Sequence, residues 1–333
     1  MRVAIDAMGG DYAPREIVAG ALDGLAFLGP DDECILIGNE QSIREHLPAG
    51  RFDSRIRIVH ASQVIEMDDV PVEALRQKKD SSIMRMAVMG ANKEVDAVIS
   101  AGNTGACVAA CQLKMRALPG VSRPGIAVSL PAFSGPVTVC DVGANVAPKA
   151  HHLLEYAQMA TIYAEVVLGI KNPRVGLLSI GGEEVKGNQL VKQTHELIRQ
   201  DSRLNFVGNV EGRELFQGAV EVAVCDGFVG NVVLKLTEGL ADGLFRTIEK
   251  ELAAEAPHLV EAFKPVVRRI WARHDYSEYG GAPLLGVDGI CIICHGSSDR
   301  RAIKNAVRVA RDCVQRDLNG IFVRRLSQET ANA

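Results

Sequence analysis

Short apolar runs rich in β-branched residues alternate with longer amphipathic stretches along most of the chain. Several of these runs are apolar at successive positions, which is typical of strands that are covered on both faces. The pattern predicts strands at residues 2–6, 33–38, 56–61, 96–100, 125–130, 137–143, 174–181, 205–210, 222–227 and 289–296.

Helical periodicity follows most of the predicted strands. The stretches with apolar residues on one face are Pro14–Leu28, Ser81–Lys93, His151–Leu168, Gln189–Gln200 and Arg300–Arg316. Asp299 is a suitable N-cap for the last of these helices. Strands that alternate with helices through short connections predict an α/β fold, a three-layer sandwich with a mainly parallel sheet. We expect one catalytic domain over residues 1–333.

The loops that follow the strands are rich in glycine and asparagine. They span residues 6–14, 100–105, 141–148, 180–188, 226–231 and 295–299. In an open parallel sheet ligands bind outside the carboxyl ends of the strands, so we expect all these loops at one edge. Glycines let a ligand approach the backbone, and helix N-termini attract anions. In the stretch AVISAGNTGACVAAC, which begins at Ala97, we expect Thr104 to cap such a helix.

Composition and charge narrow the function classes. The chain has 333 residues and a net charge of −4, which argues against general nucleic-acid binding. We find no apolar run of membrane-spanning length, and MRVAIDAMGGD reads as a first strand instead of a signal peptide. The eight cysteines are therefore expected to be reduced in a cytoplasm.

The cysteine spacing contains one pattern with a chemical meaning. CIICH at Cys291–His295 matches the spacing for covalent haem attachment, but it lies in a predicted buried strand and its loop. Cys107 and Cys111 are one helical turn apart, which equally suits small core residues. A zinc site needs about four ligands, and no second cysteine pair has metal spacing. We therefore expect no metal and no cofactor.

Known nucleotide and hydrolase signatures are missing. Gly182–Asn188 has the glycine spacing of a P-loop, but Asn188 stands where the lysine belongs. We find no G-x-G-x-x-G after a strand and no G-x-S-x-G elbow. An anion such as phosphate can then be the reactant itself, since it is a competent oxygen nucleophile. The protein would supply positioning and charge stabilisation.

The loop sequences closely resemble those of bacterial phosphate acyltransferases of the PlsX type. The resemblance runs from the first strand to the last helix and includes AIDAMGGDYAP, SQVIEMDD, RQKKDSS, SAGNTGA, DVGAN, EEVKGN, VEGREL, CDGFVGNVVLK and GGAPLLGVDGI. It differs at Ala147, where the family pattern has an acidic residue. The resemblance implies transfer of a fatty acyl group from acyl-acyl carrier protein to inorganic phosphate, which gives acyl-phosphate for phospholipid synthesis.

The same resemblance implies further properties. These are a fold like that of isocitrate and isopropylmalate dehydrogenases and of phosphotransacetylase, a homodimer, and a cytoplasmic protein at the membrane periphery. The alternative is a phosphotransacetylase-like acyl-coenzyme A:phosphate transferase, or a dehydrogenase on the related fold. A third class is a non-catalytic phosphate- or lipid-binding protein.

Roles can be assigned to single residues within this reading. We expect Lys186 to bind phosphate or the developing oxyanion, and Asn231 to contact the thioester oxygen or phosphate. Asn103, Thr104 and Gly105 are expected to hold phosphate. Further binding candidates are Gly9, Gly10, Asn145, Asn188, His295 and Ser297. Asp6, Asp141 and Asp226 are expected to order the loops and not to bind a metal.

Residues 245–279 form a separate feature, a predicted helical hairpin with an apolar stripe. Basic residues flank the stripe, as is typical of a helix at a membrane surface. The residues expected to contact the membrane are Leu259, Phe263, Val267, Ile270 and Trp271. The alternative is packing against a sister helix or a dimer partner. The basic residues also suit the acidic acyl carrier protein.

Overall fold

One eleven-stranded sheet runs through the molecule. The structure is a computed structural model that describes residues 1–48, 52–274 and 280–326, without the side chains of residues 267–268 and 271–274. The strand order is β3-β2-β1-β4-β11-β10-β5-β6-β9-β7-β8. The strands are β1 (Arg2–Asp6), β2 (Glu33–Gly38), β3 (Ile56–His60), β4 (Ala97–Ser100), β5 (Gly125–Ala132), β6 (Gly135–Cys140), β7 (Arg174–Leu178), β8 (Asn205–Val210), β9 (Val222–Val224), β10 (Ala282–Leu285) and β11 (Ile290–Ile293).

The sheet is mostly parallel, as predicted, but it reverses direction near its centre. Strand β10 is antiparallel to both β11 and β5, and β5 is antiparallel to β6. The strands β3, β2, β1, β4 and β11, here called the β1 half, therefore run opposite to β6, β9, β7 and β8, the β6 half. The prediction that all six glycine-rich loops share one sheet edge is thus wrong.

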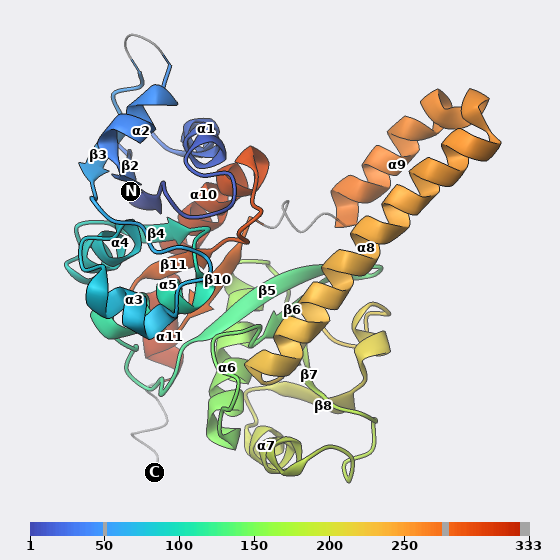
Figure 1. Ribbon diagram of the computed structural model, residues 1–333. Helices are drawn as coiled ribbons and strands as arrows, with labels where there is room; N and C mark the ends of the chain where they lie inside the picture. Colours follow the sequence, from blue (N-terminus) through green and yellow to red (C-terminus); the bar gives the residue numbers. More distant parts are fainter. Residues whose placement is uncertain (49–51, 275–279, 327–333) are drawn as a thin grey trace.

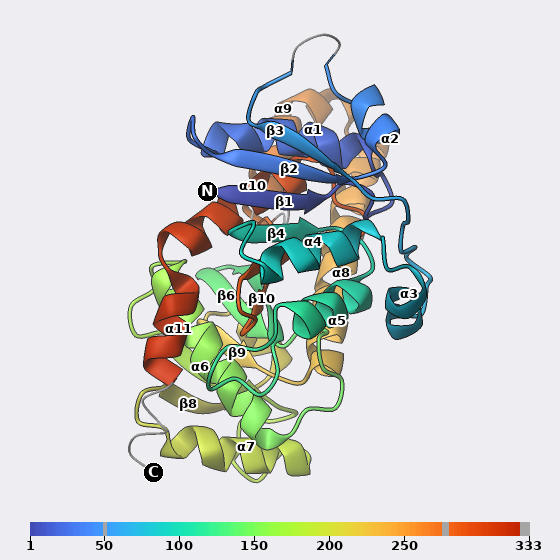
Figure 2. The same cartoon turned by 90° about the vertical axis from the view of Figure 1, so that its left-hand side faces the viewer.

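Helices cover both faces of the sheet, because alternate strand residues enter two separate cores. On β1, Val3 and Ile5 enter one core with the apolar face of α10, whereas Ala4 enters the other with α4 and α5. Figures 1 and 2 show α1 beside α10, and α4 beside α5. The helices of the body are α1 (Arg15–Gly24), α2 (Glu40–Glu45), α3 (Pro71–Gln77), α4 (Ser82–Ala91), α5 (Thr104–Lys114), α6 (Ala150–Val166), α7 (Gln189–Gln200), α10 (Arg300–Gln315) and α11 (Leu318–Leu326), with short 3₁₀ turns at Leu25–Phe27 and Gly212–Leu215.

The expected elements are confirmed with small shifts at their ends. The helix at Gln189–Gln200 has the predicted bounds, and Asp299 caps α10 by accepting a hydrogen bond from the Ala302 N–H at 2.9 Å. Strand β10 was missed. It is short and contains Pro283, which cannot donate to a neighbouring strand, so its local pattern is weak. This missed strand is the one at which the sheet first reverses.

A pair of helices projects from the body, as Figure 1 shows. Helix α8 spans Gly227–Glu255, and a 3₁₀ turn at Pro257–Leu259 leads into α9, Val260–His274. The helix that was expected from residue 245 onward begins at Gly227, because Asp226 caps it with hydrogen bonds from the Phe228 and Val229 N–H groups. Among the described helices, none combines the length and apolarity needed to cross a membrane.

Candidate active site

The loops of the β1 half are organised around the buried carboxylate of Asp6, at the end of β1. Its Oδ2 accepts a hydrogen bond from Ser100 Oγ at 2.8 Å, and its Oδ1 accepts one from the Met8 N–H at 3.2 Å. Burial raises the pKa of the Asp6 carboxyl, while hydrogen bonds from Ser82 and Ser100 oppose this rise. A Cβ at Gly9 would lie 2.5 Å from Asp6 Oδ2, so this approach requires glycine.

The next loop turns into α5 through the side chain of Asn103. Its Oδ1 accepts a hydrogen bond from the Ala106 N–H at 3.0 Å, so Asn103 and not Thr104 is the N-cap. Its Nδ2 donates to the backbone carbonyls of Glu66, Met67 and Asp69. Thr104 is then the first residue of the helix, and its side chain is exposed. Asn103 therefore ties the start of α5 to residues 66–69, and the Thr104 side chain stays accessible at the surface.

In the β6 half, the buried carboxylate of Asp141 organises the loop after β6, as Asp6 does in the β1 half. Its carboxylate accepts hydrogen bonds from four backbone N–H groups, including those of Ile126 at 3.0 Å and Asn145 at 2.7 Å. Burial raises its pKa, and these backbone bonds lower it in part. The Asn145 side-chain amide donates to Pro124 O and Tyr156 Oη, and the Asn145 backbone carbonyl accepts from the Gly227 N–H. These bonds fix the start of α8 against the loop after β6.

The loops of the two halves meet over the central strands of the sheet and enclose a cavity of about 110 Å³. Thr104 comes from α5, His295 follows β11, and Asn231 comes from the second turn of α8. Apolar residues of β5, β10 and β11 form the floor. The further lining residues are Ile126, Val128, Val142, Leu234, Lys235, Glu238, Gly281, Ala282, Ile293 and Cys294.

Lys235 and His295 are in contact at the wall of this cavity. Lys235 Nζ contacts His295 Nε2 and lies 3.0 Å from Glu238 Oε2. An ammonium group has no lone pair, so Lys235 donates to Nε2 in this contact, while Nδ1 lies 2.7 Å from Ser297 Oγ and 3.1 Å from the Ser297 backbone nitrogen. Desolvation, followed by the positive charge of Lys235, lowers the pKa of His295. The cavity therefore holds a cation beside a neutral imidazole.

A larger groove of about 730 Å³ shares Lys235, Glu238 and His295 with the cavity. It extends along α8 to Phe245 and Arg246, and Leu130 and Pro131 of β5 contribute to its wall. Tyr12, from the loop after β1, and Ser297 also line it. The small cavity with its polar groups thus joins a longer groove whose wall is partly apolar.

Comparison with known proteins identifies the family. The family model described as "Fatty acid synthesis protein" matches residues 1–320. The chain belongs to this family. A protein named phosphate acyltransferase from Desulfitobacterium hafniense (strain DSM 10664 / DCB-2) is 52% identical over 318 residues, which cover 95% of this chain and 94% of the relative. One of the same name from Pelotomaculum thermopropionicum is 49% identical over 320 residues, or 96% and 93% of the two chains.

Solved structures share the fold at much lower identity. A phosphotransacetylase from Streptococcus pyogenes superposes with a TM-score of 0.63 and 17% identity, over 95% of this chain and 94% of the other. A 4-hydroxythreonine-4-phosphate dehydrogenase from Klebsiella pneumoniae gives a TM-score of 0.51 and 13% identity, over 95% and 99%. These two likenesses concern the fold alone.

The structure brings some predicted site residues together and leaves others apart. Thr104, Asn231 and His295 line the cavity, and Ser297 lines the adjoining groove. Gly10, with φ +110°, lies against Gly296, whose carbonyl accepts from the Asp11 N–H. Gly105, on the first turn of α5, packs against Pro71 at the start of α3.

The loop after β7 stands apart from the cavity. Lys186 is exposed, and its backbone N–H donates to Glu183 O at 2.9 Å. Asn188 caps α7 by accepting from the Val191 N–H at 2.9 Å. Neither residue belongs to the described lining of the cavity or groove. Since β7 is parallel to β9, this loop emerges at the same sheet edge as the start of α8.

Lys235 is the residue that sequence reasoning missed. Lys235 lies inside α8 and not in one of the glycine-rich loops, where the sequence led us to expect the cation. It follows Asn231 by four residues, so both occupy the same helix face. That spacing was a readable signal in CDGFVGNVVLK, but its partner His295 is 60 residues away and only folding joins them.

Proposed function

We propose that the protein transfers a fatty acyl group from the thioester of acyl-acyl carrier protein to inorganic phosphate, which gives acyl-phosphate for phospholipid synthesis. Relatives named phosphate acyltransferase, about half identical over nearly the whole chain, support the transfer to phosphate. The observation that carries the proposal is the cavity in which the start of α5, Asn231 and the Lys235–His295 pair converge. This set suits an anionic reactant and a developing negative charge.

Phosphate binds at the α5 side of the cavity in this proposal. Backbone N–H groups in the first turn of a helix lack intrahelical acceptors and favour an anion. Asn103 already accepts the hydrogen bond of the Ala106 N–H, so the N–H groups of Thr104 and Gly105 are the ones that donate to phosphate. The Asp6 and Ser100 side chains hold this loop in position from below.

In the reaction, a phosphate oxygen attacks the thioester carbonyl carbon and forms a C–O bond. The carbonyl oxygen gains negative charge, and collapse of this intermediate breaks the C–S bond and releases the carrier thiolate, which takes a proton from solvent. Asn231 and Lys235 stabilise the negative charge, since preorganised donors act where charge develops. The exposed Lys186 closes on the phosphate from the loop after β7. The groove beside α8 receives the acyl chain and its carrier arm.

We extend the proposal to a homodimer built on α8. Large apolar side chains recur every four residues along this helix and are exposed in the single chain. They are Phe228, Val232, Leu236, Leu240, Leu244 and Ile248. A second copy is the occupant that we assign to this ridge, since ridges at a spacing of four residues pack against each other.

Helix α9 is the element that we assign to the membrane surface. Leu259, Phe263 and Ile270 are exposed, each by more than a third. Val267 and Trp271, also expected there, have side chains outside the described residues. Basic residues such as Arg269 on the same helix suit anionic lipid or the acidic carrier protein. The helices on both faces of the sheet would form the three layers of the isocitrate and isopropylmalate dehydrogenase-like fold, as one catalytic domain with this hairpin.

The test is phosphate-dependent release of thiol from acyl-acyl carrier protein by the purified chain. We expect release only when phosphate is present, and no absorbance change when NAD is added. Acyl-coenzyme A, tested in parallel, measures the phosphotransacetylase-like alternative. Thiol release that is independent of phosphate, or release from acyl-coenzyme A alone, would contradict the proposal.

A further inference from the structure

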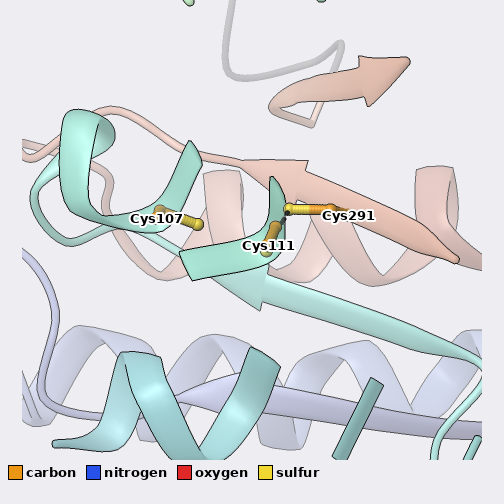
Figure 3. Close-up of side chains that lie close together, drawn as sticks. All are labelled: Cys107, Cys111 and Cys291. Carbon is orange, nitrogen blue, oxygen red and sulfur yellow. Dashed lines mark hydrogen bonds between the residues drawn. The ribbon is translucent and has the colours of Figure 1, made fainter. Parts of the chain in front are cut away.

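Three cysteines meet in the core between α5 and the sheet, as Figure 3 shows. Cys107 and Cys111 lie one turn apart on α5, and Cys291 lies on β11. Their three sulfur atoms all lie within 4.8 Å of one another, and Cys111 Sγ is 3.6 Å from Cys291 Sγ. All eight cysteines of the chain are free and buried, but this is the group in which three sulfurs from two elements converge in the described residues.

We propose that Cys107, Cys111 and Cys291 form a binding site for a soft monovalent metal ion, Cu(I). Sulfur ligands select soft ions, whereas Mg²⁺ and Ca²⁺ need oxygen ligands. Zinc sites in proteins are almost always four-coordinate, but the described residues supply a group of three sulfurs. Trigonal Cu(I) is satisfied by three sulfurs and needs no water in a buried site.

The distances fit this geometry. Sulfurs arranged as a triangle around an ion at about 2.3 Å, a typical metal–thiolate length, would be about 4.0 Å apart. Cys111 Sγ and Cys291 Sγ are 3.6 Å apart and every pair of the three sulfurs lies within 4.8 Å, so side-chain shifts of less than about 1 Å bring them to this spacing. Each sulfur that binds as a thiolate releases its proton to solvent. No electron is transferred, because copper enters and remains as Cu(I).

The burial of the site favours retention of the ion over rapid exchange. The three residues have relative exposures of 0%, 0% and 1%, and apolar residues of the α4–α5 core, such as Val98 and Ile293, share this region.

The test uses the reduced, full-length protein without oxygen, titrated with Cu(I) in competition with a chromophoric Cu(I) chelator. We expect one Cu(I) per chain to be withdrawn from the chelator, with X-ray absorption showing three sulfur ligands at about 2.3 Å. Retention of Cu(I) by the chelator would overturn the proposal. So would two sulfur ligands, or preferential binding of Zn²⁺ in a four-coordinate site.

Matched variants locate the ion. Cys111→Ser and Cys291→Ser are expected to lose the one Cu(I) ion that each chain withdraws from the chelator. Cys34→Ser, which changes a fully buried cysteine on β2, is expected to keep it. Thermal melts show whether each variant folds. If a variant does not fold, the number of sulfur ligands that X-ray absorption finds around Cu(I) in the unchanged protein tests the proposal instead. Equal loss of binding in Cys34→Ser would overturn the assignment.

Discussion

Two groups of side chains around the site differ in how the rest of the chain holds them. Asp6, Asp141 and Lys235 have hydrogen-bond partners from distant parts of the chain. Lys186 and the apolar side chains of the hairpin, by contrast, face outward. Contacts within the chain have already placed the first set, whereas our proposal has a ligand, a partner or a surface complete the second set. Substitutions should therefore separate the two sets: changes at outward-facing positions affect function without stability, and changes at positions held by contacts within the chain affect pH dependence or stability.

The largest expected effect concerns the exposed hairpin. Replacing Phe263 and Ile270 together by Asp should abolish sedimentation with anionic liposomes. Each of these side chains, when it is buried in the membrane surface, contributes about 1.5–3 kcal/mol to binding. Transferase activity on soluble substrate should persist. Ala253→Asp with Ala254→Asp adds the same charge to exposed positions of α8 and should retain most of the binding. Continued sedimentation of the first variant would show that α9 is not the anchor; loss of dimer and activity would favour a packing face.

The next effect concerns the exposed loop after β7. Lys186→Ala should lower turnover about 100-fold or more, because losing one preorganised donor to a developing charge costs roughly 2.7–4 kcal/mol. We expect Asn231→Ala to behave alike. The melting temperature should stay near that of the unchanged chain, and Lys192→Ala, an exposed lysine of α7, should retain activity. Near-normal turnover in folded Lys186→Ala would remove this residue from the mechanism.

A smaller effect is expected at Lys235, whose exposed side chain is held by contacts with Glu238 and His295. Lys235→Met should lower kcat/KM roughly 10- to 100-fold, since hydrogen bonds to charged groups contribute about 1.5–3 kcal/mol. Lys235 lowers the pKa of His295 by its positive charge, so the variant should raise that pKa. The acid limb of the pH–rate profile should then move to higher pH. Lys250→Met, farther along α8, is the control, and an unchanged acid limb would argue against the coupling.

The smallest effect is a pH dependence of stability at a packed histidine away from the cavity. His152 Nδ1 accepts a hydrogen bond from the Lys149 N–H at 2.9 Å, and desolvation lowers its pKa to about 4. The unfolded chain takes up this proton below about pH 6.5, so stability is complete above that pH and falls as the pH approaches about 4. Melting curves should show a shallower decline for His152→Asn than for His258→Asn. Equal slopes would assign the decline to other groups.

Local patterns predicted the elements and caps but not their mutual directions. Strand β1 and helix α7 were readable because their patterns are continuous in sequence. The loop chemistry was readable too, since Gly9 and Thr104 stand where strands end. The N-cap of α5 was wrongly assigned to Thr104, because the three bonds that hold the Asn103 side chain against residues 66–69 form only when that segment packs beside α5.

The sequence alone determined an α/β chain with glycine-rich loops after its strands, and its motifs indicated the family. The tertiary structure decided where these loops meet. Strand β10 reverses the sheet, so the site forms over the central strands and not at one edge. Lys235 meets His295 over 60 residues, and Cys111 meets Cys291 over 180. Periodicity and capping depend on neighbours within a few residues, whereas strand direction and these pairings depend on contacts between distant segments, which a local pattern does not encode.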